Sequence, residues 1–187
     1  IEKTAENIFV PLTVGGGVRT LEDISNLLHS GADKVSINTA AVQNRNLVKE
    51  ASNKYGASTI VVAVDAKKVS ENKWKVFTHG GRNATDLDVI DYCNEVERLG
   101  AGEILLTSMD RDGTKTGFDN DLLKTITSQL NIPVIASGGV GNLEHMYEGV
   151  SIGGASALLA ASIFHFGEYR IEDVKRYLAD KNIPVRI

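Results

Sequence analysis

FVPLTVGGGV (residues 9–18) is an apolar run of strand length that stops at three glycines, and PVIASGGV (133–140) repeats the same design. Four more runs of this kind are KVSIN (34–38), TIVVAVD (59–65), EILLTS (103–108) and SALLAA (156–161). Short runs rich in valine and isoleucine are typical of buried strands. The sequence therefore predicts six strands, nearly all of them closed by glycine or small polar residues.

Amphipathic segments fill the intervals between these runs. Residues 20–30, 85–99 and 171–181 place apolar side chains on one helical stripe. Gly31, Gly56 and Gly100 follow such segments and fit left-handed C-terminal caps. Alternating strands and helices indicate right-handed βαβ units and a parallel sheet.

We predict an α/β fold of the (βα)8 TIM-barrel type without its first two βα units, so that six parallel strands have helices outside. An open doubly wound sheet is the rival architecture. The barrel is favoured because the small residues gather at the strand ends where barrels build their sites. We expect one domain over residues 1–187, incomplete at its N-terminus because the chain opens in the middle of a helical pattern.

Residues 66–84 (AKKVSENKWKVFTHGGRNA) make a long connection after the third strand. The alternation in WKVFT and the turn-like SEN predict a β-hairpin that acts as a lid over the site. A surface insertion without function is the alternative.

The bulk composition excludes several classes of protein. A length of 187 residues, 42% hydrophobic, fits one soluble domain with a sizeable core. The net charge of −4 is spread along the chain, so we expect neither nucleic acid nor a membrane surface as partner. The single cysteine, Cys93, allows no internal disulfide and fits a cytoplasmic protein. The four histidines show no metal-ligand spacing, so we expect no metal.

The two glycine clusters predict two anion sites. Bare backbone N–H groups can approach a ligand at glycine, and the N-terminus of a helix attracts phosphate. Each cluster is paired with the end of the next strand, where Thr39 and Ser162 are expected to be N-caps. The first set is Gly16, Gly17, Asn38 and Thr39, and the duplicated set is Ser137, Gly138, Gly139, Ala161 and Ser162. Tight-turn glycines without a ligand are the alternative.

Carboxylates and polar side chains follow two other strands. Asp65 closes the run 59–65, where it can act as a general acid or base with a raised pKa, or else as a helix cap or ion-pair partner. The loop 107–117 (TSMDRDGTKTG) offers Thr107, Asp112 and Gly113 to a ligand, although Asp-Gly is also a common turn signal.

Lys34 and Glu103 begin their strands, at the opposite end of the barrel. If Asn38 and Thr107 point inward, the period of two makes Lys34 and Glu103 point inward as well. Two opposite charges there must be paired to be tolerated. The pair is then either a structural salt bridge that closes the barrel floor or a polar gate.

The motifs VPLTVGGGVRT, GADKVSINTAAV, VVAVDAKK, GAGEILLTSMDRDGTKTGFD, IPVIASGGVG and ALLAASIFHF together resemble the cyclase subunit of imidazole glycerol phosphate synthase, over essentially all 187 residues. The sister isomerase of histidine biosynthesis shares the fold and the glycine clusters. It typically has Ile-Gly-Thr where this chain has Ile37-Asn38-Thr39, and a different residue where Glu103 stands.

The resemblance implies a lyase that adds ammonia to a ribotide with a phosphate at each end, closes an imidazole ring and needs no cofactor. A glutaminase subunit supplies the ammonia at the bottom face, where Asp33 matches the partner interface and Lys34 and Glu103 match the gate. Asp65 matches one of two catalytic aspartates. The phosphate sites match Gly17, Asn38 and Thr39, and Asp112, Gly113, Gly139, Ala161 and Ser162.

The other catalytic aspartate of the family lies on the first strand, which these residues do not include. We therefore expect residues 1–187 alone to be inactive, and to self-associate through open sheet edges. The alternatives to the cyclase are the sister isomerase and a non-catalytic phosphate-binding barrel fragment.

Overall fold

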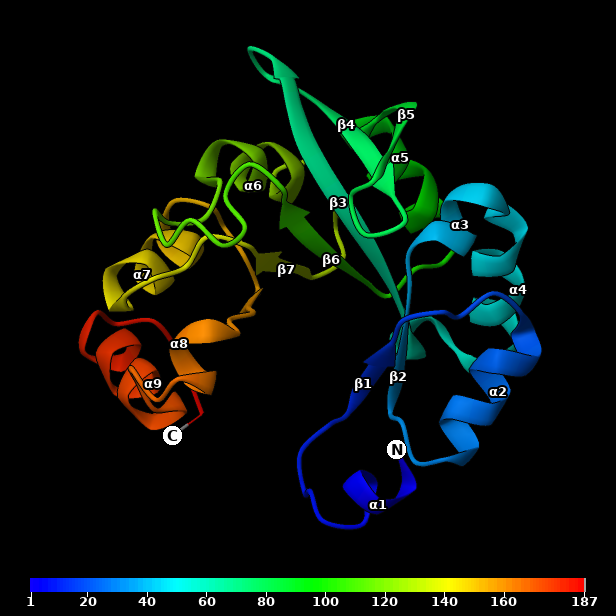
Figure 1. The fold of residues 1–187 in the computed structure, drawn as a ribbon, viewed down its shortest axis with the longest axis horizontal. Coiled ribbons are helices and arrows are strands. Elements are labelled where there is room, and N and C mark those ends of the chain that lie inside the picture. Colours follow the sequence, from blue (N-terminus) through cyan, green and yellow to red (C-terminus); the bar gives the residue numbers. More distant parts are fainter. Residues whose placement is uncertain (187) are drawn as a thin grey trace.

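The computed structural model describes residues 1–186 and has a mixed sheet at its centre (Figure 1). Six strands are parallel and hydrogen-bonded in the order β1-β2-β3-β6-β7-β8. Their bounds are β1 Thr13–Gly15, β2 Lys34–Ile37, β3 Ile60–Ser70, β6 Glu103–Ser108, β7 Val134–Ser137 and β8 Ala157–Leu158. Two further strands, β4 Lys73–Thr78 and β5 Asn83–Asp88, extend β3 in antiparallel fashion.

The order of the parallel strands follows the order of the sequence, which is the connectivity of a barrel and excludes the doubly wound alternative. The sheet curls, and the helices lie on its outer side (Figure 1). Each edge strand has a single neighbour, β2 for β1 and β7 for β8. The predicted α/β fold is therefore confirmed as a curled, partial barrel of six parallel strands.

Several of the longer helices begin at a polar side chain that caps them. Thr20 and Asp23 form a capping box at the first long helix, α2, and Asp88 and Asn142 cap α5 and α7. Gly31, at φ 99°, follows α2 in the left-handed conformation that the sequence predicted. The helices are α1 Glu2–Ala5, α2 Leu21–His29, α3 Thr39–Gln43, α4 Arg45–Tyr55, α5 Val89–Arg98, α6 Asn120–Thr127, α7 Leu143–Ser151, α8 Ser162–His165 and α9 Ile171–Asp180, with a 3-10 turn over Ala57–Thr59.

The core lies between the sheet and this outer layer of helices. Along β2, Val35 and Ile37 are fully buried, whereas Lys34 and Ser36 on the other face are only half-buried. The same alternation runs along β6, where Ile104 and Leu106 are the buried residues. Strand pleating thus divides β2 and β6 into a helix-facing half that stabilises the fold and a half that lines the concave side.

Several predicted bounds were wrong. The helical pattern over 85–99 covers two elements, because residues 83–88 form β5 and the helix begins only at Val89. Pairing of β5 with β4, in which Ala84 lies opposite Phe77, overrides the local periodicity. The run 156–161 contributes only the two residues of β8, and the run 9–14 contributes only its end to β1. Both short strands lie at sheet edges, where each is hydrogen-bonded to a neighbouring strand on one side only.

The segment after Asp65 continues β3 away from the barrel as far as Ser70, and β4 folds back along it. Trp74 on β4 is 1% exposed, so this antiparallel extension is packed against the rest of the chain. Its turn, residues 71–72, is exposed and projects farthest from the sheet (Figure 1). Within residues 1–186, no helix is both long enough and apolar enough to cross a membrane.

Candidate catalytic and phosphate-binding site

Sheet register brings three predicted site residues together at the carboxyl ends of neighbouring strands. Thr107 on β6 is the partner of Asp65 on β3 and also of Ser137 on β7. All three are half-buried and alternate with fully buried residues, so they share the concave face. Asn38 follows the neighbouring strand β2, and its Nδ2 donates to Asp65 Oδ2 at 3.0 Å. Polar groups from four strands thus form a single row.

The pKa of the Asp65 carboxyl is raised, in the direction that the sequence argument expected. Desolvation by burial is the main cause, and the negative charge of Asp112 adds to it, while the hydrogen bond from Asn38 acts in the opposite sense. A carboxylate whose pKa is raised is a stronger base than an ordinary one and returns the proton as an acid. Asp65 is therefore suited to general acid–base chemistry at the barrel mouth.

Asn38 retains an unused acceptor. Its Oδ1 is buried and has no hydrogen-bond partner within the described chain. The orientation of the amide follows from Asp65, because a carboxylate takes the NH2 side and leaves the oxygen facing elsewhere. A buried acceptor without a donor is costly, so a ligand N–H or O–H group at this point would relieve the cost.

The two glycine clusters have the same backbone shape, as the internal repeat indicated. Gly17 and Gly139 both have positive φ, 74° and 99°. Asn38 and Ala161 share an uncommon conformation, with φ −115° and ψ −94° for Asn38 and φ −114° and ψ −71° for Ala161. The duplication in sequence is therefore also a duplication of local geometry at the strand ends.

Thr39 and Ser162 lie one position further into their helices than the N-cap position that was predicted for them. They are the first residues of α3 and α8, and the N-cap positions belong to Asn38 and Ala161, neither of which makes a side-chain cap. The Thr39 hydroxyl instead accepts a hydrogen bond from the backbone N–H of His79 at 3.0 Å. The prediction of side-chain N-caps was wrong because Asn38 and Ala161 hold the N-cap positions instead. The first N–H groups of both helices have no partner in the described chain.

The second cluster lines a pocket of about 170 Å³. The sequence predicted most of its walls, and the pocket gathers them from three loops. Its lining residues are Asp112, Gly113, Lys115, Ser137, Gly138, Gly139, Val140, Leu159, Ala160, Ala161 and Ser162. The backbone N–H groups of Gly113 and Gly139 donate to no group in the described chain. Free donors around a small hollow are what a phosphate group needs.

Glycine is required at position 139 for a second reason. A Cβ there would lie 2.3 Å from the carbonyl oxygen of Gly117, and it would also meet the backbone of Arg111. The loop 109–118 packs directly on the glycine cluster, and Gly117 N–H donates to the Gly139 carbonyl at 2.8 Å. The cluster therefore combines close approach of two backbones with exposure of N–H groups.

Around the first cluster the chain is open. A Cβ added at Gly16 or Gly17 would meet nothing within 4 Å. The end of β4 closes one side of this region through the bond from His79 to Thr39. The structure thus places all four predicted residues of the first set at one end of the concave face but encloses them less than those of the second.

Sequence reasoning missed two features of this site. Lys115, which lines the pocket of the second glycine cluster, was not assigned a role, although it is the only lysine in the loop 107–117. Asp112 was assigned to phosphate binding alone, yet its charge also acts on Asp65. A charge count for each loop would have found Lys115. The proximity of Asp112 to Asp65 depends on how the loop folds back.

At the other end of the strands, Lys34 and Glu103 form an ion pair, which fits both the structural salt bridge and the polar gate. Their side chains are 28% and 18% exposed. Asp33 lies beside them and accepts a hydrogen bond from the backbone N–H of Leu12 at 2.7 Å. The structure therefore gives Asp33 a structural contact at the entry to β1, next to the paired charges.

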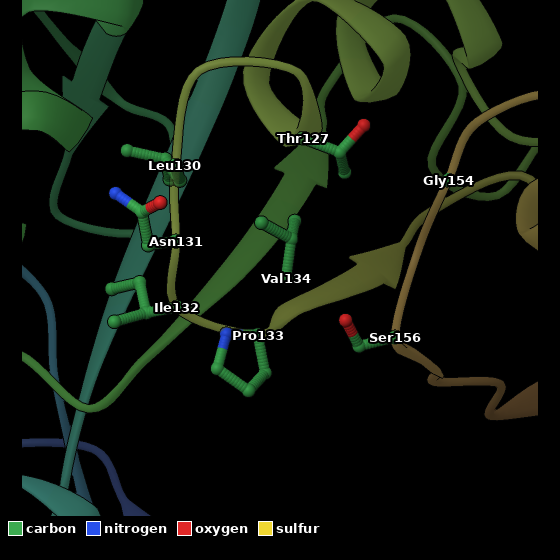
Figure 2. A pocket seen from close by; sticks show the side chains of 8 residues that line it. All are labelled: Thr127, Leu130, Asn131, Ile132, Pro133, Val134, Gly154 and Ser156. Atoms are coloured by element: carbon green, nitrogen blue, oxygen red, sulfur yellow. The ribbon is translucent and has the colours of Figure 1, made fainter.

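Another pocket, of about 200 Å³ and separate from that of the second glycine cluster, lies at the beginning of β7 and β8 (Figure 2). Its walls include Thr127, Pro133, Val134 and Ser156, and no ionisable side chain lines it. It is larger than the pocket at the barrel mouth but lies at the opposite end of the strands and has no group for acid–base chemistry. Within residues 1–186, no cluster of three or more acidic, histidine or cysteine side chains could hold a metal ion.

The duplicated glycine clusters, the row of polar strand ends and the paired floor charges agree with a comparison against known families. The family model described as "Histidine biosynthesis protein" matches residues 1–170. The chain belongs to this family. Membership places it among the histidine-biosynthesis barrels of the cyclase and isomerase type, and the match does not separate one enzyme from the other.

Proposed function

We propose that the chain is the cyclase subunit of imidazole glycerol phosphate synthase rather than the sister isomerase. The observation that supports this choice is the hydrogen bond from Asn38 Nδ2 to Asp65 Oδ2. The isomerase typically has glycine at the position of Asn38, and glycine has no side chain with which to hold that carboxylate. The Lys34–Glu103 ion pair is a second supporting feature, because the isomerase differs at Glu103.

In this proposal the substrate is a ribotide with a phosphate at each end, which spans the concave face. One phosphate binds to backbone N–H groups near Gly17 and Thr39, and the other binds in the pocket near Gly113 and Gly139. Asp65 then lies between the ends, where ammonia adds and the ring closes. The Asp65 carboxyl moves protons to and from the reacting nitrogen and oxygen atoms, for which its raised pKa is suited.

The paired charges at the floor support a role in ammonia supply. Lys34 and Glu103 lie on the same concave face as Asp65, one strand-length below it. We propose that they gate ammonia that comes from a glutaminase subunit docked at this end, beside Asp33. No cofactor is needed for addition and ring closure.

The antiparallel extension of β3 and β4 is proposed to cover one side of the bound substrate. Two backbone contacts support this placement: His79 N–H bonds Thr39 Oγ1 at 3.0 Å, and Lys68 N–H bonds Asp110 Oδ2 at 2.7 Å. The extension therefore connects the regions of the two phosphate sites. The exposed turn at 71–72 is the part that is free to move as a lid.

The test is a pair of assays on a purified eight-stranded barrel that contains these residues, because residues 1–187 alone are expected to be inactive. One assay follows ammonium-dependent release of imidazole glycerol phosphate, and the other follows the isomerase reaction on the preceding ribotide. Cyclase turnover without isomerase turnover supports the proposal, and the reverse result replaces it with the isomerase. Phosphate binding without either turnover would support the alternative of a non-catalytic binding fragment.

Asn38→Gly, which introduces the isomerase residue, tests the observation that carries the proposal. The variant loses the donor to Asp65, and we expect cyclase turnover to fall by about tenfold or more. Val69→Ser, on the exposed part of β3, is the matched control. Unchanged cyclase turnover in Asn38→Gly would remove this hydrogen bond from the argument.

A further inference from the structure

Lys115 is the only cationic side chain among the residues that line the pocket of the second phosphate site. We infer that Lys115 is a phosphate-binding residue of this pocket, and that Glu168 is the counter-ion that holds it while the pocket is empty. The inference rests on the proposed function, because it assigns a new ligand to a site which that proposal uses. It adds a positive side-chain charge to a pocket whose other polar lining comes from backbone N–H groups, the hydroxyls of Ser137 and Ser162 and the carboxylate of Asp112.

The backbone fixes the point from which Lys115 extends. Its φ is +58°, a left-handed conformation that non-glycine residues rarely adopt. The lysine backbone packs so closely on Gly141 that a Cβ there would lie 2.7 Å from the Lys115 carbonyl oxygen. A strained conformation held by tight packing is a costly way to place a surface lysine. It does keep the side chain at the pocket wall, two residues beyond the free N–H of Gly113.

The charge of Lys115 is paired with a carboxylate in the structure. Lys115 Nζ pairs with Glu168 Oε1 at 2.5 Å, and the two side chains are 47% and 37% exposed. Glu168 follows α8, whose first residue, Ser162, also lines the pocket. The ion pair therefore joins the loop 109–118 to the segment after α8.

This pair is easily exchanged. Half-exposed ion pairs contribute little, because water screens them and both long side chains lose freedom. A phosphate ester carries nearly two negative charges and three acceptor oxygens, so it attracts the ammonium group more strongly than one carboxylate does. We infer that Lys115 changes partner from Glu168 to phosphate when ligand enters.

Two variants with opposite expected effects test the exchange. Lys115→Met removes the cation but keeps the length of the side chain, and we expect phosphate affinity at this pocket to fall by about tenfold or more. Glu168→Gln removes the competing charge, and we expect affinity to rise by a few-fold. A purely structural role for the ion pair predicts that both variants weaken binding. Lys124→Met, which removes one exposed charge from α6, is the matched control.

The measurement is a titration of the 15N-labelled protein with inorganic phosphate, followed through individual backbone amides. Gly113 and Gly139 report on this pocket, and Gly17 and Thr39 report on the other site. Selective weakening at Gly113 and Gly139 in Lys115→Met, with tightening in Glu168→Gln, is the expected result. Equal affinity in wild type and Lys115→Met would overturn the inference while leaving the phosphate site in place. Absence of any response at all four amides of the wild type would instead refute the proposed function.

Discussion

Asp65 occupies a position where local chemistry and strand geometry coincide. It follows five apolar residues of β3, so it leaves the buried part of the strand just as the chain reaches the barrel mouth. Burial and the charge of Asp112 both oppose its ionisation. Replacement with asparagine would keep the shape and remove the titrating group. In an eight-stranded barrel that contains these residues, we expect Asp65→Asn to lower cyclase turnover by at least about a hundredfold.

The same substitution should not harm the fold. The pKa of Asp65 is higher in the folded protein than in the unfolded chain, so the folded state binds the proton more tightly. The stability that the Asp65 carboxyl contributes is therefore fully present below the unfolded pKa of about 3.9. It is lost as pH rises through the pKa of the folded state. Asp65→Asn avoids this loss, and we expect a gain at pH 7 of at most about 1 kcal/mol, because solvent screens the half-buried group. Thermal unfolding at pH 7 and pH 4 checks this, and a variant less stable than wild type at pH 7 would contradict it.

Lys34 and Glu103 allow a prediction by double-mutant cycle. Each is half-buried, and removal of one leaves the other charge without its partner. We expect Lys34→Met or Glu103→Leu alone to cost about 1–2 kcal/mol, less than for a fully buried pair. The double variant should cost clearly less than the sum of the two. Urea unfolding of the four proteins measures the coupling, and simple additivity would show that the charges do not interact.

For single residues, the sequence was informative within strands, where side chains alternate with a period of two. It was uninformative where loops fold back on the barrel. The inward direction of Lys34 and Glu103 follows from strand alternation, so their pairing could be predicted across 69 residues. Lys115 and Glu168 are 53 residues apart and both lie outside strands. No periodicity relates two loops, so this ion pair could be found only from the tertiary structure.

Among the elements, the antiparallel extension depends on one buried polar cluster. Trp74 Nε1 on β4 donates to Asp119 Oδ2 at 3.3 Å, and Ser108 Oγ at the end of β6 donates to the same oxygen at 3.2 Å. The other carboxylate oxygen caps α6 by accepting from Leu122 N–H at 3.1 Å. One buried aspartate therefore joins β4, β6 and α6.

Asp119→Asn tests this junction. An amide can still cap α6 but places an NH2 group where Trp74 and Ser108 both need an acceptor. We expect a loss of about 1–3 kcal/mol in the free energy of unfolding. Asp121→Asn, on the exposed first turn of the same helix, is the control and should cost only a few tenths of a kcal/mol.

The readout for this junction can be specific, because Trp74 is the only tryptophan in the chain. Its fluorescence reports the environment of β4 directly. A change in emission in Asp119→Asn but not in Asp121→Asn would show that the extension has loosened. An unchanged emission together with unchanged stability would show that the cluster does not hold the extension in place.

The elements themselves were predictable where local pattern and tertiary pairing agree. The bounds of β6 match the run EILLTS, because strand length, β-branched composition and position between helices all indicate the same element. Strand β5 was missed because NATDLD is polar and acquires its conformation only by pairing with β4. Its Asp88 then caps α5, so a strand runs directly into a helix without the usual turn signal.

At the scale of the whole molecule, the repeated βαβ pattern predicts parallel strands covered by helices, and the small residues at the strand ends favour the sequential strand order of a barrel over a doubly wound sheet. The pattern does not determine which groups form hydrogen bonds with the backbone at the two edges of the sheet. β1 and β8 each have one hydrogen-bonded neighbour, so both present backbone groups without a partner strand. Apolar side chains lie close by along the chain: Phe9, before β1, is 97% exposed, and Leu159, directly after β8, is 40% exposed.

We therefore expect residues 1–187, produced by themselves, to associate as concentration rises. Unpaired edges and exposed apolar side chains both favour contact with a second chain, and neither is disfavoured by strong charge repulsion at a net charge of −4. Phe9→Ser should weaken the association by removing the most exposed of these side chains. Val69→Ser removes a similarly exposed apolar group, 52% exposed, from the antiparallel extension and should leave association unchanged. Sedimentation velocity over a concentration series measures this, and a monomer at every concentration would show that the curled sheet tolerates its open edges.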